Sequence, residues 1–376
     1  MQVSDCEFDT NINFSGNFED ISFRSNTFIG SKFQINNSNF GVLEFFNNND
    51  PDDKNAKKNI FKTGSLSIQN STFESLFWMK NVEFMENTLI TLSSVTFNGN
   101  FFIDFIDADK LSFYNCNFIK ELRYSCNYNK SEFRKCTFFD LTSFEGLANL
   151  TTSFLWFDNC HFEKLANFNY YRLHKLRLED SSFSDNVFFQ QTYFDQAFFV
   201  RTIFEKKAWF DDIQIKEIDN CDRITIRTIK QELQKAENRI DFNKYRNYEL
   251  AAHYKELNFK KDFKDKTILW ATKWSSNFGN WVWAFWFTLI IALIFFTPYF
   301  ILENFSKSIN LNNWEDFIYG YFRFFLITDF KNEYYQAGES ILKFNCFFSL
   351  ILFILGKVLI AFGIYEMIQS FRKFKA

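Results

Sequence analysis

The chain has 376 residues, of which 22% are aromatic, and it contains 57 Phe but only 2 Pro and 11 Gly. This composition excludes a disordered or linker-rich protein, because such chains are poor in aromatic residues. The net charge of −3 combines 30 Asp+Glu and 21 Lys+Arg in residues 1–220, a net of −9, with 15 and 21 in residues 221–376, a net of +6. This difference in charge predicts that residues 1–220 and residues 221–376 lie in different surroundings.

Phenylalanine recurs at five-residue steps through the first part of the chain. Phe183 and Phe188 are five apart, and after a one-residue slip Phe194, Phe199 and Phe204 are again five apart. This step matches neither the period of a helix, about 3.6 residues, nor that of a strand, about two. It fits a chain that turns a corner every five residues, so that four pentapeptides close one square coil with the large residue inside. The residues that we predict for this core are Phe18, Phe23, Phe28, Phe33, Phe118, Phe133, Phe138, Phe183, Phe188, Phe194, Phe199 and Phe204.

A small residue stands two positions before many of these large residues. Five of the seven cysteines take this position: Cys6, Cys116, Cys126, Cys136 and Cys160. Steps of ten residues are half a coil, so successive cysteines in that series fall on opposite faces. Their spacing matches neither a disulfide framework nor a zinc site, and we interpret them as packed thiols that act as small apolar residues.

Seven three-residue segments show the small–x–Phe pattern: CEF (6–8), SNF (38–40), STF (71–73), CNF (116–118), CTF (136–138), CHF (160–162) and SSF (181–183). In this pattern the chain resembles the pentapeptide-repeat proteins, whose motif is small–Asp/Asn–Leu/Phe–x–x. The resemblance covers most of residues 5–215, with Phe in place of the common Leu, and it implies a right-handed quadrilateral β-helix. We therefore assign residues 1–220 to a β-solenoid of this type, with a polar loop inserted at about 47–64.

Residues 221–279 are predicted to form an amphipathic connector. Ile226, Ile229, Leu233, Ala236 and Ile240 recur at helical spacing among polar neighbours. We expect this helix to break near 241–242 and its aliphatic edge to cap the open end of the solenoid. A basic juxtamembrane segment follows it.

Residues 280–376 are predicted to hold two transmembrane helices. Trp281–Leu302 contains no charged residue and is long enough to cross about 30 Å of hydrocarbon, and a second span covers about 344–368. Nine Lys+Arg lie in 255–280 and 369–376, whereas the loop 303–343 holds four. This bias predicts that both termini are cytoplasmic. The first residues show no secretory signal pattern, which agrees with that orientation.

An aromatic stretch, WEDFIYGYFRFFLITDF (314–330), lies between the spans. The layout of two helices around a short re-entrant helix resembles the two-span potassium-channel pore module. The glycines of that family's filter are absent, since the chain reads FLITDFKN after Phe324. We favour an amphipathic helix in the outer interface over a re-entrant pore helix.

Lys357 is the main candidate for a functional residue, because a charge near mid-span costs about 2.5–3.5 kcal/mol and usually has a partner. Arg323, Asp329 and Glu366 are the other intramembrane candidates for function or assembly. Asp316, Asp329 or Glu366 could supply a carboxylate for the lysine.

The sequence favours a non-enzymatic protein, since it contains no phosphate loop, nucleophile elbow or metal-ligand spacing, and no cofactor is expected. We expect a multi-pass protein of the inner (cytoplasmic) membrane whose cytoplasmic β-helix is a protein-interaction scaffold. The alternative is an oligomeric, ion-channel-like protein that the β-helix regulates. The expected partners are the lipid bilayer, an unknown protein and further copies of the chain, and no nucleic acid is expected.

Overall fold

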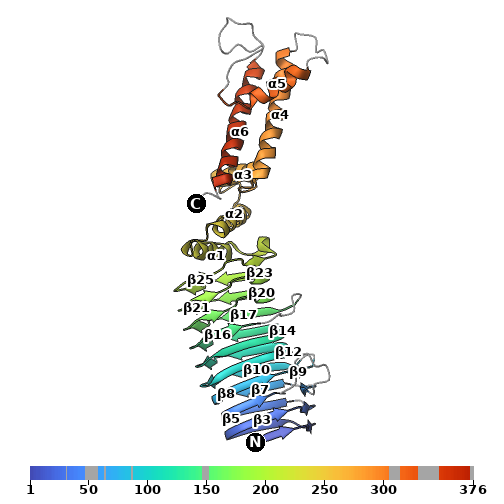
Figure 1. The fold of residues 1–376 in the computed structure, drawn as a ribbon, viewed down its shortest axis with the longest axis vertical. Coiled ribbons are helices and arrows are strands. Elements are labelled where there is room, and N and C mark those ends of the chain that lie inside the picture. The colour runs from blue at the N-terminus through green and yellow to red at the C-terminus, as the bar shows by residue number, and fades with distance from the viewer. Residues whose placement is uncertain are drawn as a thin grey trace. The chain divides into compact units, whose positions relative to one another are not determined.

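The computed structural model describes residues 1–30, 32–46, 58–62, 65–85, 88–145, 152–304, 314–328 and 347–372. The chain forms two compact units, Met1–Tyr245 and Arg246–Ala376. The first contains the strands and the second contains the long apolar helices (Figure 1).

The first unit is a parallel β-solenoid of about nine turns, followed by helices, which confirms the predicted fold class. Each strand pairs in parallel with its equivalent one coil away. The strands are β1 (Gln2–Ser4), β2 (Glu7–Phe8), β3 (Ile12–Arg24), β4 (Thr27–Phe28), β5 (Lys32–Phe45), β6 (Asn59–Phe61), β7 (Ser65–Gln69), β8 (Thr72–Lys80), β9 (Val82–Phe84), β10 (Leu89–Ser93), β11 (Thr96–Phe97), β12 (Asn100–Tyr114), β13 (Asn117–Phe118), β14 (Leu122–Arg134), β15 (Thr137–Phe138), β16 (Thr142–Phe144), β17 (Phe154–Asp158), β18 (His161–Phe162), β19 (Ala166–Asn167), β20 (Arg172–Glu179), β21 (Ser182–Phe183), β22 (Val187–Phe188), β23 (Tyr193–Val200), β24 (Ile203–Phe204), β25 (Ala208–Trp209) and β26 (Gln214–Ile215).

The parallel register places equivalent side chains above one another. Phe118, for example, pairs with Phe138 in the next coil, and their rings stack with centroids 5.0 Å apart. These two rings belong to a column of Phe side chains that runs along the solenoid. Neighbouring rings in the column have centroids 4.4–5.4 Å apart and interplanar angles of 22° or less, the offset-stacked arrangement that aromatic pairs favour. The column consists of Phe18, Phe40, Phe73, Phe97, Phe118, Phe138, Phe162, Phe183 and Phe204.

A residue with positive φ marks a recurring corner of the coil. Asn and Asp are prominent at these corners because they tolerate the left-handed conformation better than most residues. The next residue is the small one, and the Phe of the stacked column follows two positions later. The corner residues before this column are Asn37, Asn70, Ser94, Asn115, Lys135, Asn159, Asp180 and Arg201.

Most of the residues predicted for the core are buried. Phe18 is only half-buried, although its ring stacks on Phe40, because its column begins there. Those that are buried are Phe23, Phe28, Phe33, Phe118, Phe133, Phe138, Phe183, Phe194, Phe199 and Phe204.

The prediction that Phe188 points inward is wrong. Val187 and Phe189 are 1% and 0% exposed, so Phe188 between them faces outward and is only half-buried. Phe189 stacks on Phe210 at 5.0 Å, which fixes the register of this coil. The one-residue slip therefore lies between Phe183 and Phe189.

Three of the described cysteines occupy a shared column of the solenoid. Cys116, Cys136 and Cys160 are buried and free. The contact with Cys136 and burial raise the pKa of the Cys116 thiol, so it stays protonated. Cys6 is exposed in the first coil, and the side chain of Cys126 lies outside the described residues.

The predicted loop at 47–64 is shorter than expected. Asn59–Phe61 forms β6, which pairs with β4 and β9 inside the solenoid. Asn59 is fully buried, and its Oδ1 accepts a hydrogen bond from the Asn26 backbone nitrogen at 2.9 Å. The rest of the predicted loop, 47–57 and 63–64, lies outside the described residues.

A short 3₁₀ helix, η1 (Ile218–Asn220), and then α1 (Arg223–Lys235) close the last coils. Ile226, Ile229 and Leu233 of α1 are buried. The Thr225 Oγ1 accepts a hydrogen bond from the Phe199 backbone nitrogen at 2.7 Å, so α1 satisfies a strand donor as well as covering apolar rings.

The break in the connector lies earlier than predicted. Glu237 has a positive φ and separates α1 from α2 (Arg239–Glu256). The change in direction leaves Ile240 71% exposed, so this residue is not part of the capping edge.

The second unit contains α3 (Phe263–Ser276), α4 (Trp281–Asn304), α5 (Trp314–Phe324) and α6 (Phe347–Arg372). α4 and α6 lie side by side (Figure 1) and run antiparallel: Trp281 stacks on Phe371 near one end, and Glu303 meets Ser349 near the other. Trp281–Glu303 and Phe347–Phe371 are long and apolar enough to cross a membrane.

Candidate functional site around Lys357

The antiparallel register places Lys357 near the middle of the α4–α6 pair. Gly356 lies against Phe295 of α4, which is 14 residues into that helix. At about 1.5 Å per residue, Phe295 lies about 21 Å from the start of α4, which is about 36 Å long. The side chain of Lys357 is buried at that depth, with 4% of its surface exposed.

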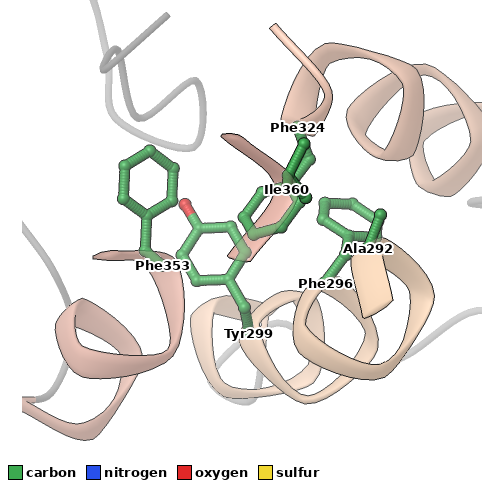
Figure 2. Packing of buried hydrophobic residues seen from close by; sticks show 6 residues of the cluster. All are labelled: Ala292, Phe296, Tyr299, Phe324, Phe353 and Ile360. Carbon is green, nitrogen blue, oxygen red and sulfur yellow. The ribbon is translucent and has the colours of Figure 1, made fainter. Parts of the chain in front are cut away.

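Gly356 provides the space in which α5 packs on α6. A Cβ at this position would lie 2.6 Å from Cζ of Phe324 and 2.9 Å from Cβ of Phe295. Only the absence of a side chain lets the Phe324 ring approach the α6 backbone. Phe324 joins an apolar cluster with Phe296, Tyr299 and residues of α6 (Figure 2).

The ammonium of Lys357 lies at the C-terminal end of α5. Its Nζ donates a hydrogen bond to the Leu326 carbonyl oxygen at 2.6 Å, and it lies 5.2 Å from the Phe324 ring and 5.3 Å from the Phe353 ring. Helix C-termini carry partial negative charge, and aromatic faces attract cations. The site therefore stabilises a single positive charge within an apolar cluster.

α5 contacts the middle parts of α4 and α6 as well as their ends. The Tyr321 hydroxyl donates to the Leu289 carbonyl oxygen of α4 at 2.9 Å, and Phe324 packs on Gly356. Both contacts fall in the middle part of the two long helices, whereas an interfacial helix would contact only their ends. The described part of the segment thus packs along α4 and reaches Gly356 and Phe353 of α6.

Of the other predicted residues, Glu366 does not reach Lys357. Glu366 lies nine residues further along α6, about 13 Å away and on the opposite side, so it is not the partner of the lysine. Its Oε2 accepts a hydrogen bond from Ser276 at 2.8 Å. Arg323 is half-buried in the last turn of α5. Asp329 lies outside the described residues, as does the side chain of Asp316.

Two buried polar pairs were missed by the sequence analysis. Glu303, 2% exposed, accepts a hydrogen bond from Ser349 at 2.5 Å, and Ser276 of α3 bonds Glu366. Each pair joins residues 46 or 90 positions apart. For Glu303 the available signal was a Glu at the end of the first apolar stretch with a Ser near the start of the second, whereas the contact of Glu366 with α3 left no such signal.

Within the described parts of the chain, no three His, Cys, Asp or Glu residues come together in a way that could hold a metal ion. Among the described residues, the site places an ammonium against a carbonyl oxygen and two aromatic rings. Comparison of the chain with protein-family models, with curated proteins and with solved structures gives no match.

Proposed function

We propose that the chain is an integral membrane protein of pentapeptide-repeat type, in which α4 and α6 anchor a cytoplasmic, non-enzymatic interaction scaffold. Both termini lie in the cytoplasm, and the membrane is the inner, cytoplasmic one. The partners are the bilayer and a protein that binds the outer faces of the solenoid, and self-association is compatible with this role.

The observation that carries this proposal is the exposed apolar surface of the two long helices. Large side chains on both are 47–58% exposed: Ile290, Leu293, Ile294, Leu355 and Val358. Each Å² of such surface left in water costs about 25 cal/mol, a cost that lipid removes. A core helix of a soluble protein would instead bury these residues.

The scaffold role is supported by the regular surface of the solenoid. Side chains on its outer faces repeat from coil to coil at about 4.8 Å, the spacing of paired strands. Such a surface presents a fixed array of groups to a partner without any rearrangement of the backbone.

Labelling of membrane topology tests this proposal. A cysteine at Asn312 should react with a membrane-impermeant maleimide in intact cells, in a background with Cys6 and Cys346 replaced by Ser. A cysteine at Ser182, half-buried on an outer face of the solenoid, should react only after permeabilisation. Labelling of Ser182→Cys in intact cells would overturn the orientation.

The alternative, a channel-like protein, is favoured by the depth of α5. In a pore of that type, the C-terminal end of the re-entrant helix faces a permeant cation. Here the Lys357 ammonium takes that position, at 2.6 Å from the Leu326 carbonyl oxygen. We therefore expect the parent chain to conduct no cations.

Flux through proteoliposomes separates the two functions. The parent chain and Lys357→Leu should both give the background rate of empty vesicles for K⁺ and Cl⁻. A flux above background that the substitution alters would support the channel.

A further inference from the structure

One outer face of the solenoid changes character along its length. In its first column, Lys110 lies beside Lys130, followed by Phe154 and Lys175 in the next two coils. In the adjacent column, Glu132 is followed by Trp156, Arg177 and Phe198. We call this region the cation–aromatic face, defined by Lys110, Lys130, Arg134, Lys175, Arg177, Phe154, Trp156 and Phe198.

The rings of this face hold the cations in place. The Arg134 guanidinium lies 4.2 Å from the Trp156 ring centroid, and the Lys175 ammonium lies 4.9 Å from that of Phe198. Lys175 is also 5.4 Å from the Phe154 ring. These distances are within the range of cation–π attraction. Both kinds of group are therefore presented together at the surface.

A single buried carboxylate organises three of the cations. Glu132, whose side chain is 7% exposed, pairs with Lys130 at 2.5 Å, Arg134 at 3.2 Å and Lys110 at 3.3 Å. The three basic side chains remain 35–41% exposed. One carboxylate cannot neutralise three cations, so positive charge is left facing solvent.

The positive excess is local. The face holds five cations against the carboxylates of Glu132, Asp158 and Glu179, which gives 5 − 3 = +2, whereas residues 1–220 as a whole have a net charge of −9. Asp158 and Glu179 follow Arg134 in the third column, along one edge of the face, and Glu179 pairs with Arg177 at 2.9 Å. The opposite edge carries the lysines, so the face is polarised across its width.

Earlier coils of the same columns lack this pattern. Ser65 and Leu89 precede Lys110 in its column, and Ser67 and Thr91 lie in the column of Glu132 and Trp156. Lys32, at the start of that first column, is exposed and belongs to this otherwise neutral part. The chain thus contains its own comparison surface on equivalent strands of the same solenoid.

We propose that the cation–aromatic face binds a short acidic segment of a partner protein. This rests on the scaffold function proposed above and names the surface that performs it. Lys110 and Lys175 are three coils apart, about 14 Å at about 4.8 Å per coil, which matches four or five extended residues. The carboxylates of the bound segment would lie along the lysine edge, away from Asp158 and Glu179. An aromatic or apolar residue of the segment would pack on Trp156.

The limited size of the face favours a short acidic segment over a nucleic acid. A longer polyanion would extend beyond the face onto a solenoid of net charge −9. A segment of a few residues stays within the positive region, where opposite charges also orient it.

The test uses the full chain in zwitterionic nanodiscs at low salt. Fluorescence anisotropy measures binding of a fluorescein-labelled peptide, Gly-Asp-Glu-Trp-Glu-Asp-Gly. The comparators are the same peptide with Lys at each acidic position, a thymidine 12-mer and phosphatidylserine vesicles. The key variants are Lys175→Glu and its matched charge reversal in the neutral coils, Lys32→Glu. Trp156→Ala removes the ring without changing the charge, and Lys175→Gln replaces Lys175→Glu if the reversal prevents folding.

We expect the acidic peptide to bind best, with affinity falling as salt rises. Lys175→Glu should weaken binding roughly tenfold and Trp156→Ala should also weaken it, while Lys32→Glu leaves it unchanged. The proposal is overturned if the parent chain does not bind the acidic peptide, if Lys32→Glu and Lys175→Glu act equally, or if Lys175→Glu weakens binding of the oligonucleotide or the vesicles more than binding of the peptide. These failures would leave the topology result, and a scaffold that uses another face, intact.

Discussion

In the solenoid, the rings of Phe113 and Phe133 stack with centroids 4.4 Å apart and planes 1° apart, whereas Phe296 and Phe324 of the helical unit are 5.5 Å apart and inclined by 51°. Parallel strands in register repeat the same residue one coil later, so rings of similar rotamer stack. Antiparallel helices bring unlike positions together, and their rings meet at whatever angle the backbones allow.

The two kinds of packing make the two units sensitive to different substitutions. A solenoid ring has equivalents above and below it, so packing is repeated many times along the core. The helical unit relies on a few close approaches, such as those at Gly356 and Gly363. The four predictions below test this contrast, from the largest effect to the smallest.

The stacked column should be sensitive to loss of a ring at its centre. Phe118→Ala should lower the free energy of unfolding by about 3–5 kcal/mol, because it leaves a cavity between two stacked neighbours. Phe118→Leu should cost less than about 1.5 kcal/mol, since Leu178 already fills such a slot between Phe157 and Phe199. Denaturant titration of the full chain, followed by circular dichroism of the strands, measures both.

The outward residue Phe188 is the control for that series. Phe188→Ala should change the unfolding free energy by no more than about 1 kcal/mol, because the side chain is only half-buried. Equal losses for Phe118→Ala and Phe188→Ala would refute the observed register.

The helical unit should depend on its small residues. A Cβ at Gly363 would clash with Oγ1 of Thr288, so Gly363→Val should destabilise the α4–α6 pair by about 1–3 kcal/mol. Unfolding by SDS in mixed micelles measures this. Val358→Leu, at a position 58% exposed, should have no measurable effect. A Gly363→Val protein as stable as the parent would argue against the close packing.

Lys357→Leu should leave global stability nearly unchanged while loosening α5. The change removes a charge that costs about 2.5–3.5 kcal/mol in the membrane, but it also removes a charged hydrogen bond worth about 1.5–3 kcal/mol. Hydrogen exchange of a peptide covering 321–328 should become faster than in the Val358→Leu control. Unchanged exchange would mean that the lysine does not hold the end of α5.

The smallest effect concerns the outer face of the solenoid. Burial raises the pKa of Glu132, but hydrogen bonds and charges from Lys130 and Lys110 outweigh it and lower the pKa below its usual value of 4.5. A carboxyl with a lowered folded pKa stabilises the protein above its unfolded pKa, and this contribution is lost as pH falls through the folded value. The melting temperature of the parent should therefore fall more steeply below pH 4.5 than that of Glu132→Gln. Parallel pH profiles would contradict this.

The sequence alone determined the solenoid and the two apolar helices. The five-residue spacing of large residues selects a repeating corner, and most of the predicted Phe residues are buried. The lengths and charge-free composition of the two spans are local properties of single segments. The solenoid can be predicted because the need for an inward-facing large residue repeats along the chain. The spans can be predicted because each is one uninterrupted apolar segment.

Features that depend on contacts with a neighbouring coil or helix are visible only in the folded chain. Val187, Phe188 and Phe189 are consecutive apolar residues, so the sequence does not show which large residue points inward. The structure shows that it is Phe189, whose ring stacks on Phe210 one coil later. In the helical unit, the hydrogen bond between Lys357 and Leu326 spans 31 residues and requires the space left by Gly356. The cation–aromatic face likewise combines residues from successive coils, and the lengths of the intervening turns differ too much for their alignment to be read along the chain.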